Sequence, residues 1–175
     1  MALNWAIRPE RPEDAASVAW LDDNGFGPGR FAKTAYRLRE GVEPERALCF
    51  VAEAQGRLLG SVRFWPIAAG RDRALLLGPL AVHETARGQG IGLALMRRGI
   101  EAAREAGHSA ILLVGDEAYY ARAGFKRVGH LNFPGPVDRT RILGLVLTRE
   151  VSGDVARARI DRPVCADGAK LARPA

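Results

Sequence analysis

A short glycine-rich turn is the part of this sequence whose residue types and spacing could do chemistry. The turn reads Arg87-Gly88-Gln89-Gly90-Ile91-Gly92, with glycine at every second position from Gly88. Peptide N–H groups in such a turn are not covered by side chains, and at the start of a helix they lie at the positive end of the helix dipole. The guanidinium of Arg87 adds a full positive charge at the same place. The sequence therefore predicts a binding site for a phosphate or pyrophosphate group.

The turn needs a strand before it and a helix after it. Upstream, Leu75–Leu77 and Leu80–Val82 form a nearly continuous apolar run, which is typical of a strand covered on both faces. Downstream, small or apolar residues recur every fourth position from Ile91, so we expect a helix over Gly92–Ala106. The next apolar run, Ala110–Val114, is expected to be a strand. A strand–helix–strand connection of this length predicts a parallel pair with a right-handed crossover.

Two common phosphate-binding motifs do not fit the turn. The dinucleotide fingerprint G-x-G-x-x-G fails because Leu93 stands in place of the third glycine, and no Gly-Lys-Ser or Gly-Lys-Thr follows as in a nucleotide-triphosphate loop. Arg87, Gly90 and Gly92 do match the signature (R/Q)-x-x-G-x-(G/A). One strand later, residues 120–125 read Tyr-Ala-Arg-Ala-Gly-Phe, with the spacing Tyr-x-x-x-Gly-Phe. With both motifs in this order, the chain resembles the GNAT superfamily of acyl-CoA-dependent N-acyltransferases.

The resemblance spans about residues 3–150, and the amino-acid sequence at 76–82 and 115–122 is most similar to the YhbS-like branch of that superfamily. It implies that the turn holds the pyrophosphate of acetyl-CoA, which is the acyl donor and the cofactor that we expect. It also implies transfer of an acetyl group to a primary amine by direct attack in a ternary complex. The residues that we assign to the cofactor on this basis are Leu80, Ala81, Val82, Arg87, Gly88, Gln89, Gly90, Ile91 and Gly92.

Because an acyl thioester is already activated, the reaction needs no covalent nucleophile on the enzyme. Backbone N–H groups near Leu80–Val82 are the candidates for stabilising the tetrahedral oxyanion. In GNAT proteins the tyrosine of Tyr-x-x-x-Gly-Phe often protonates the departing thiolate, so the resemblance gives Tyr120 the role of general acid. The alternative is that the Tyr120 ring only packs against the cofactor channel. Tyr119 is expected to be a core residue.

The identity of the general base, which must remove a proton from the amine, stays open. Many GNAT relatives carry a Glu or Asp on the strand before the turn, yet Leu75–Val82 contains no acid. The candidates are His83, Glu53, Asp22, Asp23 and an ordered water chain. No asparagine stands where many GNAT proteins use one to contact coenzyme A, and Asp116 is expected to cap a helix instead. Cys49 has apolar neighbours and is expected to be a core residue rather than a nucleophile.

Selection of the acceptor is expected to fall to the first two helices and their link, Leu21–Glu40. The acids at 22 and 23 could attract a cationic amine, whereas Arg30, Arg37 and Arg39 could equally hold a carboxylate. The sequence does not choose among a small metabolite, an antibiotic-like amine and a protein amine. A competing function is a non-catalytic module that binds acyl-CoA as a sensor.

The remaining elements follow from local patterns. We expect strands at Leu3–Arg8, Ala47–Ala54, Arg57–Pro66, Phe125–Val128 and Ile142–Thr148, and helices at Ala15–Asn24 and Arg30–Glu40. Gln55-Gly56 predicts a hairpin, and Pro66 should close its strand or lie at a sheet edge. The expected fold class is α/β in the mixed α+β sense. It is a GNAT fold with a mostly antiparallel sheet of about six to seven strands, one parallel pair, and helices on both faces.

Length and composition predict one GNAT domain over residues 3–150 and a C-terminal tail over 151–175. The tail is expected to dock through Val155, Ile160 and Val164. The net charge is +6, but acids interrupt the arginines, so we expect no nucleic-acid partner. The histidines and cysteines lack metal-ligand spacing, and we expect no metal.

We also expect no membrane partner, because no apolar run approaches the roughly 20 residues of a membrane span. The first five residues lack the blocks of a secretion signal, and two distant cysteines, Cys49 and Cys165, suggest no disulfide framework. These features favour a cytoplasmic protein. The oligomeric state stays open, although a homodimer is the commonest arrangement of soluble assemblies.

Overall fold

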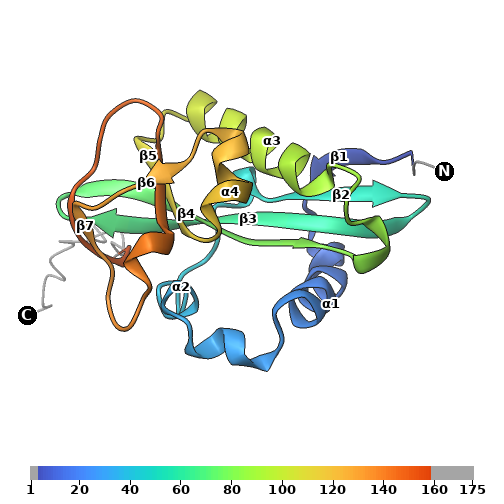
Figure 1. The fold of residues 1–175 in the computed structure, drawn as a ribbon. Coiled ribbons are helices and arrows are strands. Elements are labelled where there is room, and N and C mark those ends of the chain that lie inside the picture. The colour runs from blue at the N-terminus through green and yellow to red at the C-terminus, as the bar shows by residue number, and fades with distance from the viewer. Residues whose placement is uncertain (1–3, 159–175) are drawn as a thin grey trace, which may run out of the picture.

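A nine-stranded sheet organises the chain in the computed structural model, which describes residues 4–158 (Figure 1). Its strands are β1 (Ala6–Pro9), β2 (Phe50–Ala54), β3 (Arg57–Ala69), β4 (Asp72–Val82), β5 (Ala110–Val114), β6 (Lys126–Arg127), β7 (Leu131–Asn132), β8 (Ile142–Val146) and β9 (Gly153–Arg157). The helices are α1 (Ala15–Phe26), α2 (Thr34–Arg37), α3 (Ile91–Glu105) and α4 (Glu117–Tyr120). No helix in this part of the chain is long and apolar enough to cross a membrane.

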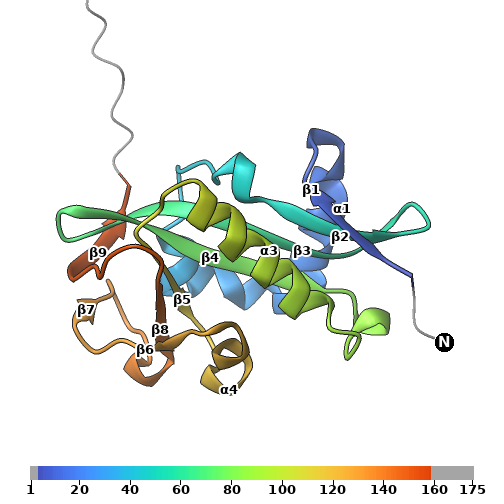
Figure 2. The same ribbon diagram turned by 90° about the horizontal axis from the view of Figure 1, so that it is seen from above.

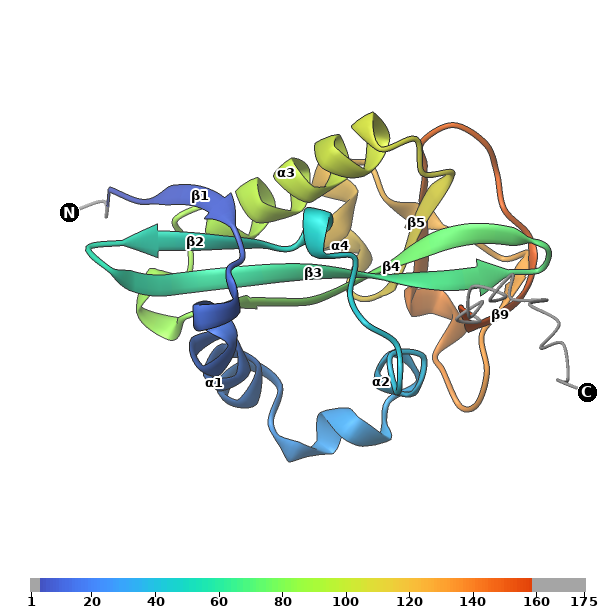
Figure 3. The same ribbon diagram turned by 180° about the vertical axis from the view of Figure 1, so that it is seen from behind.

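The strand order is β1-β2-β3-β4-β5-β8-β6, and β9 pairs with both β3 and β7. Along the main path all neighbours are antiparallel except β4 and β5, which are parallel as predicted. Helix α3 covers one face of the sheet, and α1 and α2 lie on the other (Figures 1 and 3). The mixed sheet of a GNAT fold is thus confirmed. Two short strands that were not predicted, β7 and β9, pair in parallel and add to it.

Strands β4 and β5 stay together for only two residue pairs, Leu75 with Ile111 and Leu76 with Leu112. Just beyond them β4 contains a bulge, where Gly78 and Pro79 lie opposite the single residue between Val62 and Phe64 of β3. Past the bulge β4 keeps its partner β3 but pairs no further with β5. Seen from above, β5, β8 and β6 lie to one side of the long β3–β4 ribbon (Figure 2). This divergence leaves one edge of β4 unpaired over residues 77–82.

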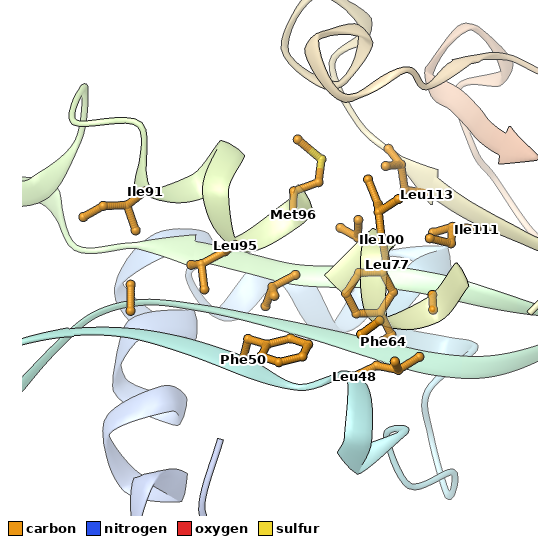
Figure 4. Packing of buried hydrophobic residues seen from close by; sticks show 14 of the residues in the cluster. Leu48, Phe50, Phe64, Leu77, Ile91, Leu95, Met96, Ile100, Ile111 and Leu113 are labelled. Atoms are coloured by element: carbon orange, nitrogen blue, oxygen red, sulfur yellow. The ribbon is translucent and has the colours of Figure 1, made fainter. Parts of the chain in front are cut away.

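Helix α3 forms because its apolar residues return to one face, and that face is buried on the sheet. Ile91, Leu95 and Met96 are at most 1% exposed and pack with Phe50 and Phe64 (Figure 4). Burying a side chain of this kind contributes about 1.5–3 kcal/mol, so this face fixes where the helix begins relative to β4.

Gly99 lets α3 approach the Phe64 ring closely. A Cβ atom at Gly99 would lie 2.2 Å from Cε2 and 2.5 Å from Cζ of Phe64, whose side chain is fully buried. We expect Gly99→Ala to lower the free energy of unfolding by about 1–3 kcal/mol in urea denaturation, because the overpacked ring cannot move aside. The control is Gly29→Ala, where a Cβ would have nothing within 4 Å. Equal stability of the two variants would contradict this contact.

The predicted helix over 30–40 is wrong. The chain instead forms a 3-10 helix at Pro28–Ala32, passes through extended backbone at Lys33 (φ −77°, ψ 142°), and then makes the single turn α2. A long-range contact accompanies the break, since Thr34 Oγ1 donates a hydrogen bond to the carbonyl of Pro136 at 3.2 Å.

Strand β3 continues past Pro66 to Ala69, so the prediction that this proline closes the strand is wrong. Pro66 pairs with Leu75 of β4, and on its other side β2 pairs no further than Val62 and β9 begins only at Ile67. It therefore occupies a local sheet edge, the second placement that we expected, where no partner needs the missing N–H group.

The chain after residue 150 begins with a strand of the same sheet. In β9, Val155 pairs with Ala69 of β3, and Val151 and Val155 are at most 4% exposed. Leu3, Ile160 and Val164, which the sequence analysis also placed, lie outside the described residues.

Candidate functional site

The turn at residues 87–92 adopts backbone that requires glycine. Gly88 (φ 79°) and Gly90 (φ 80°) are left-handed, and a Cβ on either would have nothing within 4 Å. Gly90 is the N-cap of α3, a helix of 15 residues, and Arg87 is exposed beside it. The first N–H groups of α3 have no partner within the helix. Together with the helix dipole they give the turn a positive, accessible end.

The unpaired edge of β4 leads directly to this turn. His83 N–H donates to the carbonyl of Leu59 on β3 at 2.8 Å. Because successive residues of a strand point their N–H groups to opposite sides, the N–H group of Ala81 also faces β3. Those of Leu80 and Val82 face the unpaired edge. This edge offers N–H donors held in place by β3.

Helix α4 presents two tyrosines. Asp116 caps it by accepting the N–H of Tyr119 at 3.2 Å, which confirms the expected capping role. The Tyr120 ring lies over Gly115, where a Cβ would come within 2.3 Å of Cε2, and meets Phe125 edge to face at 6.0 Å between centroids. Burial, with Tyr119 as a smaller cause, raises the pKa of Tyr120 to about 12, against the opposing charges of Arg39 and Arg141. Its phenol is thus protonated at neutral pH.

Tyr119 does more than fill the core. It packs against the core cluster, but a Cβ on Gly92 would lie 2.2 Å from its hydroxyl oxygen, so Tyr119 reaches the start of α3. The sequence placed it in the core only, because the orientation of so short a helix cannot be derived from periodicity. The absence of a side chain at Gly92 therefore allows α4, which carries Tyr119, to contact the first turn of α3.

This contact can be tested with a pair of substitutions. We expect Gly92→Ala to lower the free energy of unfolding by about 1 kcal/mol, because the Tyr119 ring must tilt to release its hydroxyl. Tyr119→Phe in the same chain should restore stability, since Cζ of the ring lies 3.5 Å from the added methyl carbon, an ordinary contact. Urea denaturation of the two single variants and the double variant measures the coupling. Additive effects would show that the hydroxyl does not touch residue 92.

Two clefts meet at these elements. The narrow cleft, of about 210 Å³, is lined by Phe26 of α1 and by Leu80, Ala81, Val82, Arg87, Tyr119 and Tyr120. The wide cleft, of about 470 Å³, shares Phe26, Leu80 and both tyrosines with it and extends along α2 to Arg141. The structure thus brings predicted residues 80–82, Arg87 and Tyr120 to one place. Neither cleft is lined by the other predicted turn residues, Gly88, Gln89, Gly90, Ile91 and Gly92, and the Ile91 side chain lies in the core.

Three of the candidate bases lie away from both clefts. His83 stacks on Trp20 with ring centroids 5.3 Å apart, and its Nδ1 lies 2.8 Å from Thr85 Oγ1. Glu53 accepts a hydrogen bond from Arg8 Nε at 2.7 Å, and Asp23 pairs with Arg30. The structure brings none of the three to the lining of the clefts around Tyr120.

Asp22 does not line either cleft, but it differs from these three in its burial. It is 8% exposed, and its Oδ1 is buried without a hydrogen-bond partner among the described residues. Burial raises the pKa of Asp22 to about 6, against the attraction of Arg63, Arg39 and Arg30. Burial likewise raises the pKa of Tyr36, and the carboxylate of Asp22 raises it further. Because Tyr36 lines the wide cleft, Asp22 is the candidate base electrostatically coupled to the site.

Cys49 is 3% exposed, and burial raises the pKa of its thiol to about 11, which confirms a core residue rather than a nucleophile. Within residues 4–158, no cluster of three or more His, Cys, Asp or Glu side chains could hold a metal ion. Sequence reasoning missed Tyr36, which has no motif around it. It named Arg39 as one of three arginines without a way to single it out.

Comparison with known proteins gives the chain its family. Residues 45–127 match the family model described as an acetyltransferase (GNAT) domain. The chain is 35% identical over 127 residues to the uncharacterised N-acetyltransferase YhbS of Escherichia coli K12, a match that covers 71% of this chain and 75% of that protein. It is 30% identical over 128 residues to YjhQ of the same organism, covering 70% and 71%.

Solved structures agree with the sequence match. The GNAT N-acetyltransferase YhbS from Escherichia coli in complex with CoA superimposes with a TM-score of 0.75 at 30% identity, covering 90% of this chain and 92% of that one. A GNAT acetyltransferase from Brucella melitensis in complex with acetyl-CoA gives a TM-score of 0.68 at 30% identity, with coverage of 89% and 96%. This chain therefore belongs to the GNAT superfamily of N-acetyltransferases.

Proposed function

We propose that this protein transfers an acetyl group from acetyl-CoA to the primary amine of an acceptor by direct attack in a ternary complex. The observation that carries the proposal is the convergence of Arg87, the unpaired edge of β4 and the Tyr120 phenol on the narrow cleft. The CoA and acetyl-CoA held by the two superimposed relatives support the choice of cofactor.

The cofactor is bound by backbone and by one full charge. The pyrophosphate lies at the start of α3, against the N–H groups of residues 88–92 and the Arg87 guanidinium. The pantetheine arm enters between β4 and β5, where the N–H groups of Leu80 and Val82 have no strand partner. The thioester carbonyl then lies beside donors that β3 already holds in position, so the oxyanion is stabilised with little reorganisation.

In the reaction the amine nitrogen attacks the thioester carbonyl carbon, and a C–N bond forms as the carbonyl oxygen becomes an oxyanion. Collapse of the tetrahedral intermediate breaks the C–S bond, and the departing thiolate takes the proton of Tyr120. The nitrogen then gives up its excess proton, which restores the Tyr120 phenol and leaves the neutral amide. A lysine-like amine, with a pKa of about 10.4, is mostly charged at pH 7, so its proton must be removed first. We assign that proton to Asp22, which does not line the wide cleft, so a water molecule must carry the proton between the amine and the carboxylate. An ordered water chain to solvent is the alternative.

The proposal is tested by calorimetric titration with acetyl-CoA, followed by a CoA-thiol release assay over a panel of amines. Saturable binding and amine-dependent thiol release are expected. Binding without release for any amine would favour the sensor function, and absence of acetyl-CoA binding would overturn both. Tight, salt-sensitive binding to DNA or RNA instead would indicate a nucleic-acid function.

A further inference from the structure

Arg39 is a buried cation in the wall of the wide cleft. Only 9% of the residue is exposed, and it follows α2 at the place where the chain passes the β4 bulge. Its guanidinium lies over the Tyr36 ring at 4.8 Å and over the Trp65 ring at 5.9 Å. Its Nη2 atom is close to Gly78, where a Cβ would come within 2.9 Å. The two aromatic rings pack against the guanidinium, and its Nε and Nη1 atoms are buried in the cleft wall.

Two nitrogen atoms of Arg39 have no hydrogen-bond acceptor among the described residues. Nε and Nη1 of Arg39 are buried without a hydrogen-bond partner, and no ion pair forms between Arg39 and the rest of residues 4–158. Burial lowers the pKa of Arg39 to about 10, yet the group stays charged at neutral pH. A buried charged donor without an acceptor is costly, and an anion that enters the cleft would offset that cost.

The other charged groups of the wide cleft do not supply this anion. Asp138 accepts hydrogen bonds from Thr140, and Asp116 caps α4. Asp22 attracts Arg39 through space, but its own Oδ1 has no partner, so the two groups do not meet. Three more cations, Arg30, Lys33 and Arg141, line the same cleft. Its lining therefore carries more positive than negative groups, which favours an acidic ligand.

We propose that Arg39 binds a carboxylate of the acceptor, so that the acceptor is an amino carboxylate rather than a polyamine or another purely cationic amine. The inference rests on the proposed function and names its substrate class. A carboxylate suits a guanidinium because two parallel N–H donors can meet its two oxygens.

The spacing along β4 agrees with this class. Gly78, beside Arg39, is two residues from Leu80, where the acetyl carbonyl is expected, and the bulge between them keeps their separation below the roughly 7 Å of a regular strand. A small amino acid can bridge that distance with its carboxylate at one end and its amine at the other. Gly78 also leaves the approach to Arg39 free of a side chain.

The test compares free amino acids with their carboxamides as acceptors, by kcat/KM in the thiol-release assay. For the wild type we expect a preference for the carboxylate of about 10–100-fold, the effect of one charged hydrogen-bonded pair. Arg39→Met should bring this ratio close to one. The matched control is Arg37→Met, which removes the same charge from the exposed face of α2. It should keep the wild-type ratio.

Thermal unfolding of Arg39→Met checks that the variant is folded, and we expect it to be at least as stable as wild type because an unpaired buried charge is removed. A wild type that prefers carboxamides, or an Arg39→Met variant that keeps the carboxylate preference, overturns the inference. If the enzyme acetylates amines that have no carboxylate but does not acetylate amino carboxylates, this inference is overturned and the proposed function stands. No CoA release with any amine overturns both.

Discussion

Replacing Tyr120 with phenylalanine is expected to lower kcat by about 10²–10⁴-fold while leaving the Kd for acetyl-CoA nearly unchanged. The substitution keeps the ring on Gly115 and against Phe125, so folding and cofactor packing are preserved. It removes only the proton that the departing thiolate needs. Without that proton the tetrahedral intermediate returns to the thioester more often than it goes forward.

The environment of Tyr120 bears on how the proton moves. With a pKa of about 12, the buried Tyr120 phenol is a weaker acid than a thiol in water, whose pKa is about 8.5, so proton transfer to a fully solvated thiolate would be uphill in free energy. The thiolate, however, forms in the same desolvated cleft, and burial raises the pKa of a thiol just as it raises that of a phenol. We therefore expect proton transfer to accompany cleavage of the C–S bond. No loss of kcat through ionisation of Tyr120 is expected below about pH 11.

The measurement is steady-state kinetics of CoA release, with calorimetry for the acetyl-CoA Kd. Tyr119→Phe serves as the comparison, because it removes a hydroxyl that lies against Gly92 and is not assigned to protonate the thiolate. Its loss of kcat should stay below about 10-fold. A Tyr120→Phe variant within threefold of the wild-type kcat would mean that the ring of residue 120 only packs.

Local sequence was enough to predict the strand, the turn and the helix from Leu75 to Glu105. Each depends on residues close to one another: an apolar run, left-handed glycines, and a period that buries Ile91 and Leu95. The role of Tyr120 stays a prediction, made from the resemblance of a motif six residues long, whereas the strand, the turn and the helix are confirmed. These are features that a short segment determines by itself.

What the sequence could not supply depends on distant partners. The break at Lys33 is accompanied by a contact between Thr34 and Pro136, 102 residues apart. The β4 bulge is visible only in its register against β3. The sequence named Asp22 and Arg39 as candidates beside other acids and arginines, with no feature to single them out. Burial distinguishes them: the side chain of the neighbouring Asp23 is 60% exposed, whereas Asp22 is buried.

Asp22 makes the folded chain less stable as its carboxyl group ionises. Below pH 3.8 the group is protonated in the folded and unfolded states alike, and it contributes no difference. Between 3.8 and about 6 the unfolded chain loses the proton first, so the free energy of unfolding falls as pH rises. Above about pH 6 the full penalty is present, on the order of 3 kcal/mol at 1.36 kcal/mol per pKa unit.

Asp22→Asn should therefore raise the free energy of unfolding by up to about 3 kcal/mol at pH 8 and leave it almost unchanged at pH 4. The amide keeps the shape of the carboxyl group and cannot ionise. Urea denaturation at the two pH values measures the effect. Asp23→Asn, the exposed neighbour that pairs with Arg30, is the control and should show no such pH dependence.

The same variant reports on catalysis, because a buried carboxyl group with a raised pKa is a candidate for a general base. If Asp22 accepts the amine proton, wild-type kcat/KM should rise through an apparent pKa of about 6, and Asp22→Asn should lose both that limb and most of its turnover. A more stable variant with unchanged turnover would leave water as the route for the proton. A stability gain of equal size at pH 4 and pH 8 would contradict the raised pKa itself, since a group that ionises alike in both states cannot make stability depend on pH.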